Sequence, residues 1–196
     1  MEDPRLLRGR GRYVDDVVLP RMLSLAFVRS PHAHAAIRAV DSSAARTLDG
    51  VVGVFTAAEL GRVARPLVPR LESDGFTPTA WRPLADGVAR FAGEAVAAVV
   101  ASSPYVAADA RERVLVEYEP LAAVASIDAA LARGRTLFRR DYQNGDVDGA
   151  FAKAAILIRE TFEHGRCAAS PIEPRGVVAA WDGETLTVWA SPQTPS

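Results

Sequence analysis

The sequence predicts an α+β fold, and three observations indicate it. Segments typical of strands and helices alternate along the chain, most clearly from Phe91 to Pro120. An earlier stretch, Ile37 to Phe55, repeats the strand, helix, strand order, and the chain closes on a predicted hairpin. Hydrophobic residues make up 49% and charged residues 24% of the 196 positions, which is typical of a globular protein.

The first 55 residues are expected to form an arm followed by short strands and a helix. Residues 1–20 show little periodicity, and the first strand is expected over Leu23 to Arg29. Two more strands are expected over Ile37 to Val40 and Val51 to Phe55. Between them, Asp41 to Leu48 begins with acidic and hydroxyl residues, which suit the capped start of a helix.

A short helix and a long loop are expected next. Thr56 to Glu59 has the form of a capping box, in which the hydroxyl and the carboxylate each accept an amide from the other end. The following residues, Gly61 to Arg90, contain Pro66, Pro69, Pro78 and Pro83 and show no sustained period. A loop of this length is usually functional or mobile.

The second strand, helix, strand unit is the most strongly patterned part of the chain. Val96 to Ala101 is an unbroken apolar run, as in a strand buried on both faces. Ser102-Ser103-Pro104 is typical of a helix start, with a hydroxyl to cap the first amides and a proline in the first turn. In this helix, expected over Ser102 to Arg113, Val106 and Ala110 should face the sheet, and a second strand is expected over Val114 to Tyr118. Because about a dozen residues separate the two strands, we expect a right-handed crossover that joins parallel neighbours.

The last third of the chain is expected to contain two short helices and three strands. A helix over Ser126 to Arg133 should end at Gly134, and Leu137 to Asp146 should be a connector. One or two helical turns over Asp146 to Lys153 should lead into a long strand, Ala155 to His164.

A hairpin is expected at the end of the sequence. Its strands, Gly176 to Trp181 and Thr185 to Ala190, should be joined across Asp182-Gly183 as a two-residue turn with positive φ at both positions. A lone hairpin is marginally stable, so we expect further structure after Ser196.

Charge and cysteine content exclude several classes of protein. The formal net charge is −1, so no strong positive field attracts nucleic acid or anionic lipid, and we expect neither a nucleic-acid partner nor a membrane span. Cys167 is the only cysteine, which excludes an internal disulfide and a self-contained thiolate site for zinc or iron–sulfur. This favours a reducing cytoplasm, and no apolar stretch follows the N-terminal arginines as a secretory signal would require.

Two clusters near the start of the chain could be functional sites. His32 and His34 have the spacing of two metal ligands on one side of a strand, but no third ligand lies nearby, and bonds to backbone are the simpler interpretation. Residues 9–12, GRGR, could contact phosphate or nucleic acid, but no strand precedes them and no clear helix follows. We expect the glycines to allow close backbone passage and the arginines to pair with carboxylates such as Asp15 and Asp16.

Two further candidates lie near the end. His164, Cys167 and Ser170 are close in sequence, but triad members usually come from separate elements, so we expect Cys167 to be a small buried hydrophobe. Glu173 is held between Pro171-Ile172 and Pro174, and Arg175 is close enough to neutralise its carboxylate.

Several blocks of sequence carry a resemblance to a known family. FAGEAVAAVVA followed by AADARERVLVEYEP resembles the second half of the α/β hammerhead domain of the xanthine dehydrogenase, aldehyde oxidase and carbon monoxide dehydrogenase family. Three earlier blocks match in the family's order: GRGRYVDD (9–16), RSPHAHAAI (29–37) and GVVGVFTAAEL (50–60). PIEPRG (171–176) and LTVWASPQTP (186–195) resemble the first strands of the molybdopterin domain.

The resemblance implies a domain order and a function. It implies a hammerhead domain over residues 1–125, a connector over 126–153, and the first strands of a molybdopterin domain over 154–196. The parent would be the large subunit of a molybdenum hydroxylase, which oxidises a small substrate with oxygen derived from water. It would use a molybdenum–molybdopterin cofactor in its cytosine dinucleotide form, with an iron–sulfur subunit and an FAD subunit as partners in a homo-oligomeric, cytoplasmic complex.

The resemblance places the glycine-rich pterin loops and the catalytic glutamate of the family after Ser196. We therefore expect no catalytic, cofactor-binding or metal-binding residue in this chain, which alone should hold no molybdenum, iron or flavin.

This sequence departs from the family pattern in places. The loop before PIEPRG, which runs near molybdenum in the family and often presents a glutamine, here reads Gly165-Arg166-Cys167-Ala168-Ala169, and this departure bears on the substrate class. Ala95 stands where the family commonly has proline, Ile172 where it has methionine, and Ser196 where it has histidine. The alternative hypothesis is a stand-alone hammerhead module for interaction or assembly, without catalysis.

Overall fold

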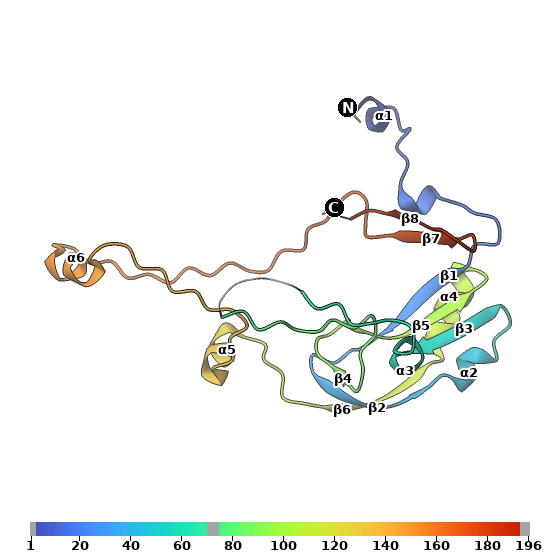
Figure 1. The fold of residues 1–196 in the computed structure, drawn as a ribbon, viewed down its shortest axis with the longest axis horizontal. Coiled ribbons are helices and arrows are strands. Elements are labelled where there is room, and N and C mark those ends of the chain that lie inside the picture. Colours follow the sequence, from blue (N-terminus) through green and yellow to red (C-terminus); the bar gives the residue numbers. More distant parts are fainter. Residues whose placement is uncertain (1–2, 70–74, 193–196) are drawn as a thin grey trace. The chain divides into compact units, whose positions relative to one another are not determined.

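A computed structural model describes residues 3–69 and 75–192 of the chain (Figure 1). The expected loop Gly61 to Arg90 includes residues 70–74, and Ser196 follows the last described residue, so these parts of the expectations lie outside the described residues. The chain forms two compact units, one of residues 23–147 and one of residues 1–22 with 148–196. Each is described by itself.

The larger unit contains two antiparallel sheets. In the first, β5 (Ala95–Ala101) lies between β1 (Ser24–Arg29) and β3 (Val51–Thr56). In the second, β2 (Ala35–Asp41) lies between β4 (Val88–Ala89) and β6 (Leu115–Pro120). The predicted strands at residues 23–29, 37–40, 51–55 and 96–101 are confirmed to within a few residues.

The predicted parallel crossover is wrong. Val99 of β5 pairs antiparallel with Ala26 of β1 and with Val54 of β3, so β5 has no free edge. The next strand, β6, instead pairs antiparallel with β2 in the other sheet. The distance in sequence between β5 and β6 is long enough for β6 to lie parallel beside β5. Both edges of β5, however, pair with β1 and β3, which come earlier in the chain.

Helix α4 (Pro104–Glu112) begins as predicted and packs against the first sheet. The Ser103 hydroxyl accepts the Val106 N–H at 3.2 Å, and Pro104 occupies the first turn. Ala110 is fully buried, as expected, but its fully buried companion is Ala107, and Val106 is only half-buried. The small alanine side chains let the helix approach the sheet closely.

The main hydrophobic core lies between this helix and the first sheet. Its fully or nearly buried members come from both, together with Ala45 of α2 (Ser43–Arg46) and Val114, which follows α4. They are Val28, Ala45, Val54, Ala97, Val99, Ala110 and Val114. Helix α2 is shorter than predicted, and it starts where the Asp41 carboxylate accepts the Ser43 N–H at 2.9 Å.

The predicted capping box at Thr56 is confirmed at the start of α3 (Ala57–Leu60). Glu59 Oε2 accepts the Thr56 N–H at 2.7 Å and also bonds the Thr56 hydroxyl. These hydrogen bonds, with a weaker contribution from Arg46, hold the pKa of Glu59 below its ordinary value of 4.5.

The capping box should make stability depend on pH. Because the folded-state pKa of Glu59 is depressed, its contribution is fully present above about pH 4.5 and is lost as the pH falls through the lower folded-state value. Glu59→Gln should remove this dependence and cost less than about 1 kcal/mol, since the side chain is 40% exposed and screened by water. Urea titrations at pH 3 to 7 measure the effect. Identical pH profiles for the two proteins would contradict it.

The connecting segments agree with the sequence in part. Helix α5 (Ile127–Arg133) is capped by Ser126 and ends at Gly134 with φ of 68°, as predicted, and α6 (Val147–Lys153) follows the expected connector. The N-terminal arm contains a short helix, α1 (Asp3–Leu7), too short to show a repeat in the sequence. The expected long loop contains strand β4 near its end and, among its other described residues, an isolated bridge between Leu67 and Trp81.

The smaller unit contains the predicted hairpin, with a different turn. β7 (Val177–Trp181) and β8 (Leu186–Ala190) pair antiparallel, and Trp181 lies opposite Leu186, so the loop has four residues. Only Gly183 has positive φ; Asp182 instead accepts the N–H groups of Thr185 at 2.7 Å and Glu184 at 2.9 Å. These bonds lower the pKa of Asp182. The carboxylate closes the turn through its acceptor atoms, so Asp182 does not need a left-handed backbone.

The expected long strand over Ala155 to His164 is wrong in this structure. These residues belong to no strand and all are exposed, and no other described segment exchanges backbone hydrogen bonds with them. Within residues 3–69 and 75–192, no helix has both the length and the apolar character needed to cross a membrane.

Candidate functional site

The smaller unit brings two of the sequence blocks together. Residues 9–16 lie against residues 171–176, where Glu173 Oε1 accepts the Val14 N–H at 2.8 Å. A Cβ at Gly176 would lie 3.2 Å from Val14 Cγ1, so the two backbones approach closely at that glycine. Beside this contact, Val14, Val17 and Val178 are buried together.

A tight turn presents the Val14 N–H to Glu173. Residues Val14–Asp16 form one turn of 3₁₀ helix, in which Asp16 Oδ2 accepts the Tyr13 N–H at 2.8 Å. The expected pairing of Asp16 with the arginines of the GRGR block is therefore wrong. Neither Arg10 nor Arg12 forms an ion pair within the described residues. Gly11 does allow close passage, since a Cβ there would meet Leu6 at 3.0 Å.

The expected pairing of Glu173 with Arg175 is also wrong. The Glu173 carboxylate accepts the Val14 amide, and Arg175 forms no ion pair in the part of the chain that is described. A hollow of about 170 Å³ lies between the two blocks, lined by Tyr13, Val14, Asp15, Asp16, Ile172, Glu173 and Pro174. Both carboxylates are structural acceptors of backbone N–H groups: Asp16 closes the turn of the arm, and Glu173 joins the arm to the segment before the hairpin.

The sequence did not indicate a second polar cluster, around Glu94 in the larger unit. Glu94 is 5% exposed, and its carboxylate accepts the Arg90 N–H at 2.5 Å and Nε at 2.8 Å, with a further contact from the same guanidinium. Its backbone carbonyl accepts the Ser30 N–H at 2.9 Å, and the Gly93 N–H donates to Ser30 O at 2.7 Å. The sequence feature that could have indicated this cluster is a single glutamate directly before an apolar strand.

This cluster fixes three segments to one another. Arg90 also donates to Ala80 O at 3.2 Å, and Arg29 donates to Gly93 O at 2.8 Å. It therefore links the end of β1 and the long proline-containing loop to the start of β5. The arrangement orders a loop and has no nucleophile beside a base.

The two candidate histidines contact different groups. His34 Nδ1 lies 2.8 Å from Ala122 O, which agrees with the backbone interpretation, while the His32 ring lies edge-on to Tyr118 with centroids 5.0 Å apart. Burial raises the pKa of Tyr118. No group of three or more His, Cys, Asp or Glu placed to hold a metal occurs among the described residues.

The three residues considered as a catalytic triad are not brought together with residues from other elements. His164, Cys167 and Ser170 all lie on the exposed segment after α6. The expectation of a buried Cys167 is wrong: the thiol is exposed, with Gly165 O at 3.7 Å, because no other described segment packs over it.

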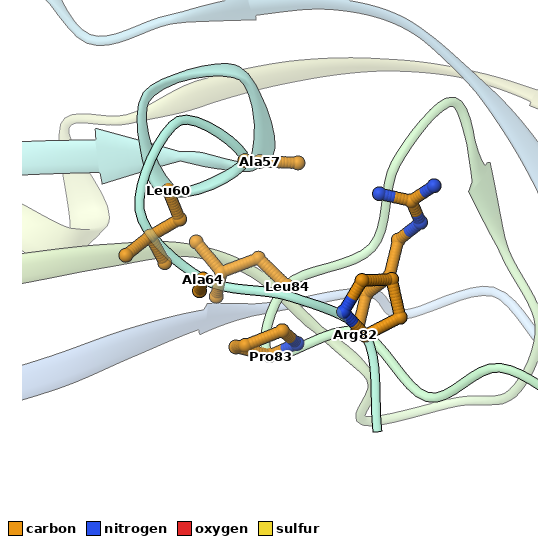
Figure 2. Close-up of a pocket in the computed structure, with 8 residues that line it drawn as sticks. Ala57, Leu60, Ala64, Arg82, Pro83 and Leu84 are labelled. Atoms are coloured by element: carbon orange, nitrogen blue, oxygen red, sulfur yellow. The ribbon is translucent and has the colours of Figure 1, made fainter. Parts of the chain in front are cut away.

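A small pocket in the larger unit lies beside α3 (Figure 2). It is lined by Ala57, Leu60, Gly61, Ala64, Pro66, Arg82, Pro83 and Leu84 and has a volume of about 10 Å³. That is room for about one water molecule, so it does not admit a metabolite.

Comparison with known proteins assigns the chain to a family. Residues 8–122 match the sequence family described as aldehyde oxidase and xanthine dehydrogenase, a/b hammerhead domain. The chain belongs to this family. Residues 131–196 match the molybdopterin cofactor-binding domain, so the hammerhead is followed by the start of a second domain in the order that the resemblance implied.

Relatives of this hammerhead chain are large subunits of enzymes. It is 38% identical to the carbon monoxide dehydrogenase large chain of Afipia carboxidovorans, over 100% of this chain and 27% of that protein. It is 36% identical to the nicotine 6-hydroxylase large subunit of Paenarthrobacter nicotinovorans, over 99% of this chain and 25% of that protein.

The fold agrees with a solved relative as well. Quinoline 2-oxidoreductase from Pseudomonas putida 86 superimposes with a TM-score of 0.91 at 41% identity, over 99% of this chain and 26% of that one. The hammerhead chain therefore spans about a quarter of the length of these relatives.

Proposed function

We propose that this chain is the N-terminal part of the large subunit of a molybdenum hydroxylase. The observation that carries the proposal is the order of the two matches, the hammerhead at 8–122 followed by the cofactor-binding domain at 131–196. Relatives with this arrangement are named as a carbon monoxide dehydrogenase, a nicotine hydroxylase and a quinoline oxidoreductase. The proposed reaction is oxidation of a small substrate with oxygen derived from water.

The proposed cofactor is molybdenum with molybdopterin, in the cytosine dinucleotide form. The described residues do not fit this group by themselves. Glu173, the carboxylate fixed between prolines, is occupied by the Val14 amide, and residues 154–172 are exposed and form no cradle. We therefore assign no step of the reaction to a residue of this chain. Its role is structural: the arm packs on the first hairpin of the cofactor domain, and the larger unit forms the core of the hammerhead.

The proposed partners are an iron–sulfur subunit and an FAD subunit in a cytoplasmic, homo-oligomeric complex. Support comes from relatives named as a large chain, a large subunit, and the gamma subunit of a dehydrogenase complex. Electrons taken from the substrate must leave the large subunit, and redox cofactors on partner subunits would accept them.

The proposed domain boundaries are 1–125 for the hammerhead, 126–153 for the connector and 154–196 for the start of the cofactor domain. The ends of the two family matches, 8–122 and 131–196, support them. In space, the first 22 residues group with residues 148–196, because the Val14 turn packs on Glu173 and Val178.

Elemental analysis of the full-length protein purified from its source tests the proposed function. We expect stoichiometric molybdenum and an extractable pterin nucleotide in the full-length protein, whereas the 196-residue chain alone, as the matched control, should hold neither. A full-length protein without molybdenum or pterin would reject the proposal and support the stand-alone assembly module. Molybdenum bound to the 196-residue chain alone would contradict its structural role.

A further inference from the structure

The chain contains one asparagine, Asn144, and a glycine follows it directly. Both residues lie in the connector between α5 and α6, where they belong to no helix or strand (Figure 1). Asn-Gly is chemically labile in a solvated chain, because the glycine nitrogen can attack the side-chain amide of the asparagine and close a five-membered ring. In a folded protein, the attack requires that neither group is held by the surrounding structure.

The structure leaves both reacting groups free. Asn144 and Gly145 are exposed, and neither the Gly145 N–H nor the Asn144 carboxamide has a hydrogen-bond partner in the part of the chain that is described. A Cβ added at Gly145 would meet nothing within 4 Å, so the peptide between the two residues has room to turn. Gly145 already has a φ of 73°, in a region that other residues rarely adopt. Local rotation alone can therefore bring the Gly145 nitrogen to Asn144 Cγ.

We propose that Asn144 is a site of spontaneous deamidation, which converts it to a mixture of aspartate and isoaspartate. The Gly145 nitrogen loses its proton to base and bonds to Asn144 Cγ, the carboxamide C–N bond breaks, and ammonia leaves with a proton from water. The attack joins neighbouring residues, so it is intramolecular and needs no binding step. Water then opens the resulting succinimide. The reaction needs no cofactor, oxidant or enzyme, and it is independent of the proposed function.

The two products differ in their backbone. Opening of the ring at Cγ gives aspartate, whereas opening at the main-chain carbonyl leaves the chain linked through the side chain, with one extra methylene in the backbone. Both products add a negative charge beside Asp146 and Asp148. The change lies within a few residues of the boundary between the two compact units, at residues 147 and 148. Isoaspartate also presents the carboxylate that protein-isoaspartate methyltransferases recognise, which makes an enzyme of this class the partner of the modified chain.

Two other positions in the chain serve as internal controls. Gln143 is exposed in the same connector, but its longer side chain would close a six-membered ring, which forms more slowly. Asp182 also precedes a glycine, but its carboxylate accepts the N–H groups of Glu184 and Thr185, which hold it in the hairpin turn. These hydrogen bonds also lower the pKa of Asp182, and an ionised carboxylate is a poor target for a nucleophile. We therefore expect no conversion at residues 143 and 182.

Peptide mapping by mass spectrometry of the full-length protein, after incubation in buffer, tests the proposal. The peptide with residue 144 should gain the mass difference between a hydroxyl and an amino group and separate into two forms. The isoaspartate form should accept a methyl group from a protein-isoaspartate methyltransferase, used as the probe. Conversion should rise from about pH 6 to about pH 9, because the attack requires loss of the Gly145 N–H proton. If residue 144 stays asparagine, or residue 182 forms isoaspartate as fast, the proposal is overturned.

Two variants of the full-length protein test the role of each residue in the pair. Gly145→Ala should slow conversion at least about tenfold, because the added Cβ hinders the approach of the nitrogen to Cγ. Alanine disfavours a left-handed φ, so Asn144→Gln, which leaves the backbone unchanged, is the second variant and should show no conversion at residue 144. Conversion of Gly145→Ala at the rate of the unaltered protein, or of Asn144→Gln at the rate of asparagine, would reject the proposed ring closure.

Discussion

Ala110→Asp is expected to lower the free energy of unfolding of the larger unit by at least about 4 kcal/mol, the largest effect we predict for a single substitution. Ala110 is 0% exposed and lies in the core cluster with Val28, Ala97 and Val99. The new carboxylate would be too large for the close approach of α4 to the sheet, and it would have no hydrogen-bond donor in an apolar site. Urea titration of the 196-residue chain, followed by circular dichroism, measures the change.

Ala108→Asp provides the matched control for this prediction. It makes the same substitution on the same helix at a half-buried position, and it should cost no more than about 1 kcal/mol because the carboxylate can reach water. Equal destabilisation by the two variants would show that the buried face of α4 is wrongly assigned.

Glu94→Ala should destabilise the larger unit by about 2 to 3 kcal/mol. The substitution leaves the Arg90 backbone N–H without its acceptor and removes the partner of a guanidinium that is itself partly exposed. Exposure of Arg90 moderates the effect, since water can solvate the freed charge. We also expect the loop that Arg90 holds through Ala80 O to exchange its amides faster. Urea titration and hydrogen exchange measure the two effects.

The exposed Arg38–Glu119 pair gives a direct comparison. Both of its side chains are more than half exposed, so Glu119→Ala should cost less than about 1 kcal/mol. If Glu119→Ala proved as costly as Glu94→Ala, burial would not be the reason that the Glu94 cluster is stabilising.

Local signals in the sequence determined where most elements begin and end. Ser103 with Pro104 fixed the start of α4, Thr56 with Glu59 fixed the start of α3, and Gly134 fixed the end of α5. Each of these helix-end signals acts through atoms within about one helical turn, so the helix end can be predicted without knowledge of the rest of the chain. The sequence blocks also identified the family, because their order along the chain can be recognised without knowing which strands are neighbours.

Only the tertiary structure decided which distant segments meet. Strand order could not be predicted, because pairing β5 with β1 and β3 depends on competition among edges far apart in sequence. The partner of Glu173 was missed for the same reason: Arg175 is near in sequence, but the Val14 amide, 159 positions away, is near in space. Residues 155–164 show that a local pattern is not enough: they have the sequence of a strand, but a strand forms only when a neighbouring strand accepts its hydrogen bonds.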